Sequence, residues 1–191
     1  MSVEATIIGS SSGETIQGSD LSEQIEAGGG LDLVRAGDGD DIVFGGANRD
    51  KLYGDEGSDE LYGGGSNDRL YGGEGEDILD GGAENDRIFG GADSDIIIGG
   101  DGNDVMYGDS ADGNDNEGFA DTFVFDAADG NDKVFDFESG VDMIELTENV
   151  GYTLEFHAGT GNTTLTYGST TVTFLDEEVL AADISGGFEI A

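Results

Sequence analysis

A nine-residue repeat runs through the first half of the chain and limits its fold more than any other feature. From Gly9 to Tyr107 the sequence divides without insertion into eleven nonapeptides, of which nine begin with Gly and two with Ala27 and Ala36. A fixed short period is typical of a solenoid, in which each unit stacks on its neighbours because it cannot bury an apolar face alone. We therefore expect a repetitive, stacked fold.

Two positions of the repeat stay in phase through all eleven units. The sixth position is acidic: Glu14, Glu23, Asp32, Asp41, Asp50, Asp59, Asp68, Asp77, Asp86, Asp95 and Asp104. The eighth position is apolar: Ile16, Ile25, Val34, Val43, Leu52, Leu61, Leu70, Leu79, Ile88, Ile97 and Met106. A polyanionic, Gly-rich composition is often a sign of disorder, but a disordered chain has no reason to keep this phase.

Charge and composition exclude several functional classes. The chain has 44 acidic and 6 basic residues, a formal net charge of −38, no Cys and a single His. So few cations make nucleic acids and anionic membranes unsuitable partners. The absence of Cys excludes disulfides and thiolate sites, and one His excludes a multi-histidine zinc centre. His157 is predicted to be a strand surface residue.

Two further features bear on where the protein acts. The longest apolar runs, such as Ile96 to Ile98, are too short to span a membrane. The first residues, Met1 to Ala5, lack the basic start and apolar stretch of a secretory signal peptide. We expect no membrane span and no signal of that type at this end.

The best-formed units, Gly72 to Asp80 and Gly99 to Tyr107, resemble the haemolysin-type (RTX) calcium-binding repeat. The resemblance implies an all-β fold, a right-handed parallel β-roll in which two units complete one coil. It also implies Ca²⁺ as the bound cofactor. Each unit would be a Gly-rich turn of six residues followed by a three-residue strand with its central side chain inside.

The sequence supports a doubled period of 18 residues independently. Units starting at 45, 63, 81 and 99 end in an aromatic residue, and three of them carry a cation at the seventh position. Units starting at 36, 72 and 90 carry Ile there: Ile42, Ile78 and Ile96. The roll should thus have two unlike sheets, and five and a half coils at about 4.8 Å each would be roughly 26 Å long.

The stacked acids point to cation binding. Carboxylates of one column would lie about 4.8 Å apart, roughly twice a calcium–oxygen bond of about 2.4 Å. Two carboxylates with no cation between them would repel each other by about 1 kcal/mol in water, and by more in a turn from which water is excluded. Backbone carbonyls of the turns can complete the shell. Seven same-column Asp pairs are predicted as sites, formed by Asp32, Asp41, Asp50, Asp59, Asp68, Asp77, Asp86, Asp95 and Asp104.

Some positions are expected to bind more weakly. Glu14 and Glu23 follow turns that lack most of the glycines, and Asp121, Asp132 and Asp142 belong to a degraded motif beyond the strict repeat. Asn48, Ser66, Glu84 and Asp93 replace the fourth-position Gly, which places the affinity of those turns in doubt.

The domain organisation follows from where the register ends. Residues 9–107 are predicted to form the β-roll and the polar stretch 108–118 a loop. Residues 119–191 should hold degenerate repeats and an antiparallel β cap, with Leu165 and Tyr167 joined through Gly168 and Ser169 to a strand containing Val172 and Phe174. This region is similar to the segment after the repeats of serralysin-type secreted proteases and to alginate epimerase R-modules. That similarity implies an uncleaved type I secretion signal, the secretion machinery as a partner, and an extracellular location.

The outward side chains of the two sheets differ. On one sheet Lys51, Arg69 and Arg87 pair with Tyr53, Tyr71 and Phe89, an arrangement we interpret as local charge balance and packing over the rings. On the other sheet an apolar strip runs from Ile42 to Ile98, and we expect the C-terminal segment or a partner to cover it.

The leading functional prediction is a non-enzymatic, secreted module that folds on binding about seven to nine calcium ions outside the cell. The alternative is a carbohydrate-binding module of a secreted polysaccharide-modifying enzyme. The net charge disfavours polyuronates, although Arg69 and Arg87 leave that class open. An ice-binding or adhesive roll would need regular Thr or Asn rows on a flat face, and the turns do not provide that regularity.

Overall fold

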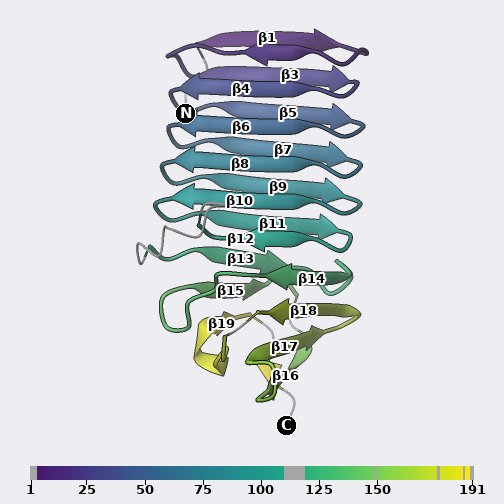
Figure 1. Cartoon of the computed structure of the whole chain (residues 1–191), viewed down its shortest axis with the longest axis vertical. Helices are drawn as coiled ribbons and strands as arrows, with labels where there is room; N and C mark the ends of the chain where they lie inside the picture. The colour runs from purple at the N-terminus through teal and green to yellow at the C-terminus, as the bar shows by residue number, and fades with distance from the viewer. Residues whose placement is uncertain (1–3, 110–118, 149, 176, 187, 190–191) are drawn as a thin grey trace.

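Two sheets, whose strands are parallel throughout the roll, face each other along the molecule (Figure 1). The structure is a computed structural model that describes residues 4–109, 119–148, 150–175, 177–186 and 188–189. Most of the predicted loop, residues 110–118, and residues 1–3 lie outside the described part.

The first sheet, here called sheet A, has nine strands in spatial order of increasing number. They are β1 (Ala5–Ser10), β3 (Glu23–Gly29), β5 (Ile42–Ala47), β7 (Glu60–Gly65), β9 (Ile78–Ala83), β11 (Ile96–Asp101), β13 (Thr122–Phe125), β15 (Met143–Leu146) and β19 (Ile184–Ser185).

The second sheet, sheet B, has eleven strands. In spatial order they are β2 (Thr15–Gln17), β4 (Leu33–Asp38), β6 (Lys51–Glu56), β8 (Arg69–Glu74), β10 (Arg87–Ala92), β12 (Val105–Tyr107), β14 (Asn131–Val134), β18 (Thr170–Phe174), β17 (Asn162–Tyr167), β16 (Gly151–His157) and β20 (Phe188–Glu189). A short 3-10 turn, η1 (Ala181–Asp183), precedes β19.

The chain alternates between the sheets, so the doubled period is confirmed. Ile42 in β5 pairs with Glu60 in β7, and Lys51 in β6 pairs with Arg69 in β8, each 18 residues on and parallel. Two nonapeptides therefore complete one coil of a parallel β-roll, as predicted.

The strands are longer than expected. Most run for six residues, from the seventh position of one unit to the third of the next. The prediction of three-residue strands was wrong because the Gly-rich positions also pair between coils: Gly73 pairs with Asp55, and Glu74 with Glu56. Glycine makes this possible, because Gly73 has φ +133° and a Cβ there would clash with the Asp55 carbonyl oxygen of the coil before.

The core is one apolar ladder in the narrow space between the sheets. The eighth-position side chains from Ile25 to Met106 are fully buried, and Phe123, Val134 and Ile144 continue the ladder beyond the strict repeat. In the strict repeat each strand thus contributes one large inward side chain, as the alternation predicts, whereas β13 and β15 each contribute two. Because the ladder of the strict repeat is one large side chain wide in each sheet, its stability depends strongly on what joins coil to coil.

The C-terminal part extends the roll lengthwise. β11 pairs with β13 at a spacing of 26 residues, β12 with β14 at 28 and β13 with β15 at 21, so longer connections are inserted between coils that keep their parallel register. The predicted antiparallel strands are present as β16, β17 and β18, and β18 pairs with β14. Buried Leu165, Tyr167, Val172 and Phe174 close that end of the core.

The described C-terminal strands do not cover the apolar strip of sheet A. They add to the ends of both sheets, and Ile96 remains 40% exposed while Ile78 is half-buried. The expected covering by this segment was therefore wrong. Among the described residues, no helix has the length and apolar character needed to cross a membrane.

Candidate metal centre

The sixth-position acids stand in two columns, one at each edge of the roll. The column before sheet A holds Glu23, Asp41, Asp59, Asp77, Asp95, Asp121 and Asp142, and the column before sheet B holds Glu14, Asp32, Asp50, Asp68, Asp86, Asp104 and Asp132. In each column the backbone N–H of one acid donates to a carboxylate oxygen of the acid one coil further, at 2.6–3.0 Å. Each Asp carboxylate of the two columns therefore accepts a hydrogen bond from its own column through one oxygen only.

The second carboxylate oxygen has no protein partner at most of these positions. The Oδ2 atoms of ten Asp residues are buried without a hydrogen bond: Asp32, Asp41, Asp50, Asp59, Asp68, Asp77, Asp86, Asp95, Asp104 and Asp132. A buried, unpaired anionic oxygen is costly, and a native fold normally supplies a partner for it. A hard cation is a partner of the right chemistry.

The glycine that opens each unit makes room for this oxygen and brings a second oxygen to it. A Cβ placed on Gly72 would lie under 3.0 Å from both Asp77 Oδ2 and the Gly90 carbonyl oxygen of the next coil. An equivalent pair, one Asp Oδ2 and one carbonyl oxygen of the next coil, lies beside each of six glycines: Gly45, Gly54, Gly63, Gly72, Gly81 and Gly90. Each of these glycine-lined cradles joins a carboxylate to a backbone carbonyl of the following coil, which is the mixed oxygen set that calcium accepts.

Burial without a partner makes these acids resist ionisation. It raises the pKa of Asp95 to about 9 and of Asp59 and Asp86 to about 8, and neighbouring carboxylates of the same column add to the effect. No group of three or more acidic or His side chains gathers at one point in the described part of the chain. Backbone carbonyl oxygens would thus have to supply many of the ligands of any bound metal ion.

The weaker positions divide into two kinds. The Glu14 and Glu23 carboxylates each already accept hydrogen bonds from a serine, Ser10 and Ser19, through both its N–H and its hydroxyl. At Asp142 one oxygen accepts the N–H of Glu138. These three have little capacity left for a cation.

Asp121 and Asp132 resemble the regular positions instead. Asp132 Oδ2 is buried and unpaired like those of the strict repeat, and Asp121 Oδ2 faces Gly108 as its counterparts face their glycines. Sequence reasoning ranked them low because insertions break the register before them, yet the parallel pairing of β13 and β14 restores their place in the columns.

Two of the predicted sites lack the glycine that opens the other units. Ala27 and Ala36 open the units of Asp32 and Asp41 and are fully buried. Their methyl groups occupy the place that glycine leaves open elsewhere, so these two cradles should be narrower.

Sequence reasoning also missed Asp136, which accepts the N–H groups of Gly108 and Asp109. The exposed His157 lies at the end of β16, 3.1 Å from the Thr164 hydroxyl, as predicted for a strand surface residue.

The four residues that replace the fourth-position Gly adopt the left-handed conformation that glycine would. Asn48, Ser66, Glu84 and Asp93 have φ between 72° and 91°. For a residue with a Cβ this costs about 1 kcal/mol or more. The turns therefore keep their shape at the expense of stability.

Replacing Glu84 with glycine should stabilise the folded chain. We expect E84G to raise the free energy of unfolding in saturating calcium by about 1 kcal/mol, because glycine adopts φ +77° without strain. Denaturant unfolding would measure the change. E76G, which removes the same charge at an exposed turn position not in the left-handed region, is the control, and an equal gain in both variants would contradict the assignment of strain to Glu84.

Comparison with known families agrees with this geometry. Four copies of the model for the RTX calcium-binding nonapeptide repeat match residues 17–52, 44–79, 53–88 and 80–116. A comparison with curated proteins finds no match. Among solved structures, the chain is similar to the crystal structure of the extracellular lipase LipA from Serratia marcescens, with 16% identity and a TM-score of 0.47, over 96% of this chain and 40% of that one.

The lipase likeness is too distant to carry an argument, and this chain spans less than half of that protein's length. The repeat matches together span residues 17–116, more than half of the 191 residues. They coincide with the columns of acids and the glycine-lined cradles. The chain belongs to the family of RTX calcium-binding nonapeptide repeat proteins.

Proposed function

We propose that the chain is a non-enzymatic module that folds when calcium occupies the cradles between its coils. The observation that carries this proposal is the repeated, buried and unpaired Oδ2 atom beside a carbonyl oxygen of the next coil. Bound calcium would supply positive charge and oxygen coordination to both groups at once. Six cradles hold both oxygens, so we propose at least six ions, against the seven to nine expected from the sequence alone.

The chain's own residues explain why folding and binding would be one event. Each cradle is built from two coils, so it does not exist in the unfolded chain. The apolar ladder is narrow, and the unpaired carboxylates oppose its formation. The binding free energy would then act as folding free energy.

A calcium titration followed by far-UV circular dichroism tests the proposal. We expect a coil spectrum in chelator and a β spectrum in millimolar calcium, with magnesium much less effective because it demands a tighter octahedral shell. A β spectrum of full amplitude in chelator, or no change on adding calcium, would contradict it.

Acid should partly replace calcium. The pKa values of Asp59, Asp86 and Asp95 rise from an ordinary 3.8 to about 8 or 9 in the folded chain. A raised carboxyl pKa contributes stability that is complete below the unfolded pKa and is lost as the pH rises through the folded one. The calcium-free chain should therefore show more β structure near pH 5 than above pH 8. Circular dichroism in chelator at both pH values measures this, and more coil at the lower pH would refute it.

We further propose that the module works outside the cell. Extracellular-type sites have dissociation constants of about 10⁻⁴ to 10⁻³ M, so they would stay empty at cytosolic calcium levels and fill after export. The proposal of type I secretion rests on the resemblance of residues 119–191 to the segment after the repeats of serralysin-type secreted proteases. Fusing this segment to a reporter in cells with and without a type I exporter would test it, with export only in the first as the expected result.

A further inference from the structure

The outward side chains of sheet A form a surface that combines apolar residues with acids. We call it face A, and it is built by β3, β5, β7, β9, β11 and β13. Phe44 and Ile96 are exposed on it, and its acids are Glu26, Glu60 and Asp80. No described strand of sheet A contains Lys or Arg. An apolar surface that the described chain leaves uncovered indicates a site of association.

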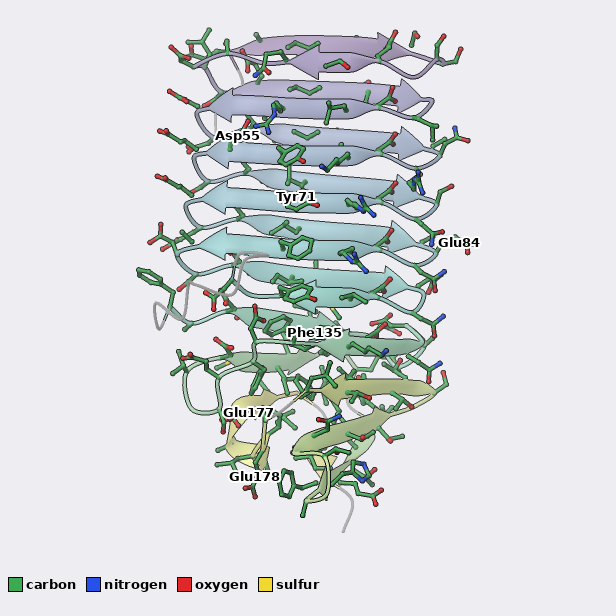
Figure 2. All side chains as sticks on the ribbon, in the orientation of Figure 1. Asp55, Tyr71, Glu84, Phe135, Glu177 and Glu178 are labelled. Carbon is green, nitrogen blue, oxygen red and sulfur yellow. The ribbon has the colours of Figure 1, made fainter. Side chains whose placement is uncertain are left out.

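The outward side chains of sheet B form a surface of the opposite character, here called face B. Ring centroids of its aromatic column lie 4.7–5.0 Å apart, and Figure 2 shows two members of the column, Tyr71 and Phe135. Five of the six basic residues of the chain lie in strands of this sheet: Arg35, Lys51, Arg69, Arg87 and Lys133. Face B thus presents positive charge where face A presents negative charge.

The protein makes little use of these cations itself. Arg69 and Arg87 are exposed, and neither forms an ion pair with any described residue. Local charge balance, which the sequence led us to expect, is therefore wrong for these two. Lys51 lies over the rings of Tyr53 and Tyr71, as predicted. The charges of both arginines remain available to a partner.

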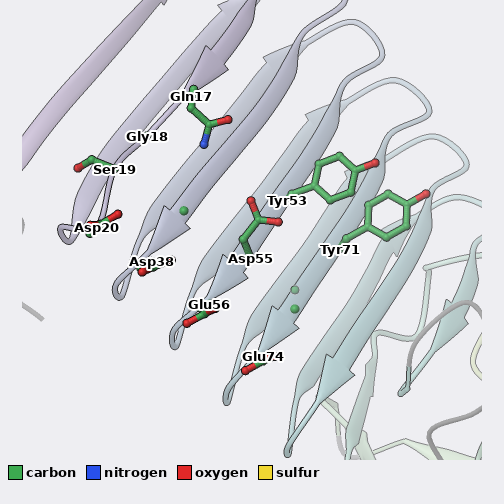
Figure 3. Close-up of a pocket in the computed structure, with 13 residues that line it drawn as sticks. Gln17, Gly18, Ser19, Asp20, Asp38, Tyr53, Asp55, Glu56, Tyr71 and Glu74 are labelled. Atoms are coloured by element: carbon green, nitrogen blue, oxygen red, sulfur yellow. The ribbon is translucent and has the colours of Figure 1, made fainter.

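Each face differs between the start and the end of its strands. On face B three of the cations are the first residues of β6, β8 and β10, whereas acids stand at strand ends. Figure 3 shows the acids Asp38, Glu56 and Glu74 at successive turns, beside Tyr53 and Tyr71. On face A the second repeat position, near the strand end, is always glycine: Gly28, Gly46, Gly64, Gly82 and Gly100.

Two copies of the chain match each other in spacing without adjustment. Faces A and B belong to the same coils, so their side chains repeat at the same interval of about 4.8 Å. Successive strands lie over one another with little rotation, which keeps both faces nearly flat (Figure 1). Face A of one copy can therefore meet face B of another over several coils at once.

We infer that face A of one copy docks on face B of a second copy, with the two roll axes antiparallel. The strands of the two sheets run in opposite directions (Figure 1). If the second copy were only shifted, the strand starts of face A, with Glu60, would lie over the acidic strand ends of face B. A half-turn about the sheet normal places strand starts over strand starts and the acidic ends over glycines, so that opposite charges meet.

One register of this arrangement brings the central acids of face A to cations. It places β7 over β10 and β9 over β8. Glu60 then lies opposite Arg87, since each is the first residue of its strand. Asp80 lies opposite Tyr71 and beside Arg69, within reach of the guanidinium group. Both central coils of the contact would thus be held by opposite charges.

The same register matches the outer coils. It places β3 over β14, so that Glu26 and Lys133 are neighbours, and β5 over β12, so that Phe44 meets Tyr107. Among outward-facing strand residues only Asp101, over the acidic end of β6, faces a like charge. Contact between two copies of face A would instead bring acids to acids with no cation between them.

The contact should be weak and open-ended. Six coils and strands of six residues make each face roughly 29 Å by 20 Å, so the contact would bury on the order of 1,100 Å² in total, the range of reversible association. A pair joined in this way still has a free face A and a free face B, so further copies can add. The net charge of −38 opposes association at long range, but physiological salt screens charges beyond about 8 Å.

Sedimentation velocity of the calcium-loaded full chain at physiological salt, up to several hundred micromolar, tests the inference. We expect the weight-average mass to rise with concentration and to exceed that of a dimer. The variants E60K/D80K and R69E/R87E should each need at least about tenfold higher concentration to reach the same mass. An equimolar mixture of the two should associate within about threefold of the wild-type chain, because the reversed face A then meets the reversed face B.

The matched control is D40K/E76K, which makes the same charge change at exposed turn positions outside both faces. It should associate as well as the wild-type chain or better, because lower net charge reduces repulsion between copies. I96Q changes no charge and should weaken association at least about threefold. Circular dichroism in calcium first checks that each variant is folded, which separates this test from that of calcium-dependent folding.

Four results would each overturn the inference. They are a wild-type chain that stays monomeric, a mass that levels off at the dimer, a mixture no more associated than its two components, and a control variant as impaired as E60K/D80K.

Discussion

Replacing Gly72 with alanine should remove one calcium ion and destabilise the holo protein by about 3 kcal/mol or more. The added Cβ would lie under 3.0 Å from Asp77 Oδ2 and the Gly90 carbonyl oxygen, the two groups that form the cradle. Because both belong to the packed turns, neither can move away without breaking the coil-to-coil bonds of the column. Calcium counting together with denaturant unfolding in saturating calcium measures both effects.

G65A is the matched control for this substitution. Gly65 also lies in a strand of the roll, but a Cβ there meets nothing within 4 Å and its backbone is not left-handed. It should keep the full number of ions and change the free energy of unfolding by less than about 0.5 kcal/mol. Equal damage from both substitutions would mean that the first-position glycine serves the backbone in general and not the cradle.

Replacing Asp59 with asparagine should lower the stability of the folded chain in calcium and raise it without calcium. The amide keeps the oxygen that accepts the Asp41 N–H, but it replaces the unpaired Oδ2 with a neutral donor next to the Gly72 carbonyl. In calcium the variant loses an anionic ligand, so we expect one ion fewer and about 3 kcal/mol less stability. In chelator it removes a buried carboxylate whose pKa is raised to about 8, so folding becomes less unfavourable.

Osmolyte-induced folding in chelator measures the second effect, since excluded osmolytes favour the compact state. D59N should fold at a lower osmolyte concentration than the wild-type chain. The control D38N removes the same charge at an exposed position at the end of β4. It should change the free energy of unfolding by no more than about 0.5 kcal/mol, with or without calcium. A D59N variant that is less stable in both conditions would show that the carboxylate is structural and has no link to the cation.

The repeat predicted the part of the fold that depends on local pattern. The buried ladder from Ile25 to Met106, the 18-residue register and the antiparallel cap with Leu165 and Val172 all followed from period and alternation. Strand length did not, because the pairing of Gly73 with Asp55 depends on the adjacent coil and not on the residues themselves. The added half-coil at β1 was also missed, since its sequence precedes the first recognisable unit.

For the candidate site, the sequence predicted which acids align but not how each oxygen is used. Stacking alone suggested pairs of carboxylates with no hydrogen bonds. In the structure the backbone N–H of Asp59 donates to one carboxylate oxygen of Asp77, and the other oxygen has no hydrogen-bond partner. The serine partners of Glu14 and Glu23 and the normal geometry of Asp132 required the three-dimensional register.

Counting bound calcium by native mass spectrometry, on samples whose β content is followed at the same calcium concentrations, tests the central claim most directly. The account predicts at least six ions per chain, one for each cradle in which a buried Asp oxygen meets a carbonyl of the next coil. It also predicts that ions and β structure appear together in one cooperative transition. A fully folded chain carrying no more than one or two ions would contradict it.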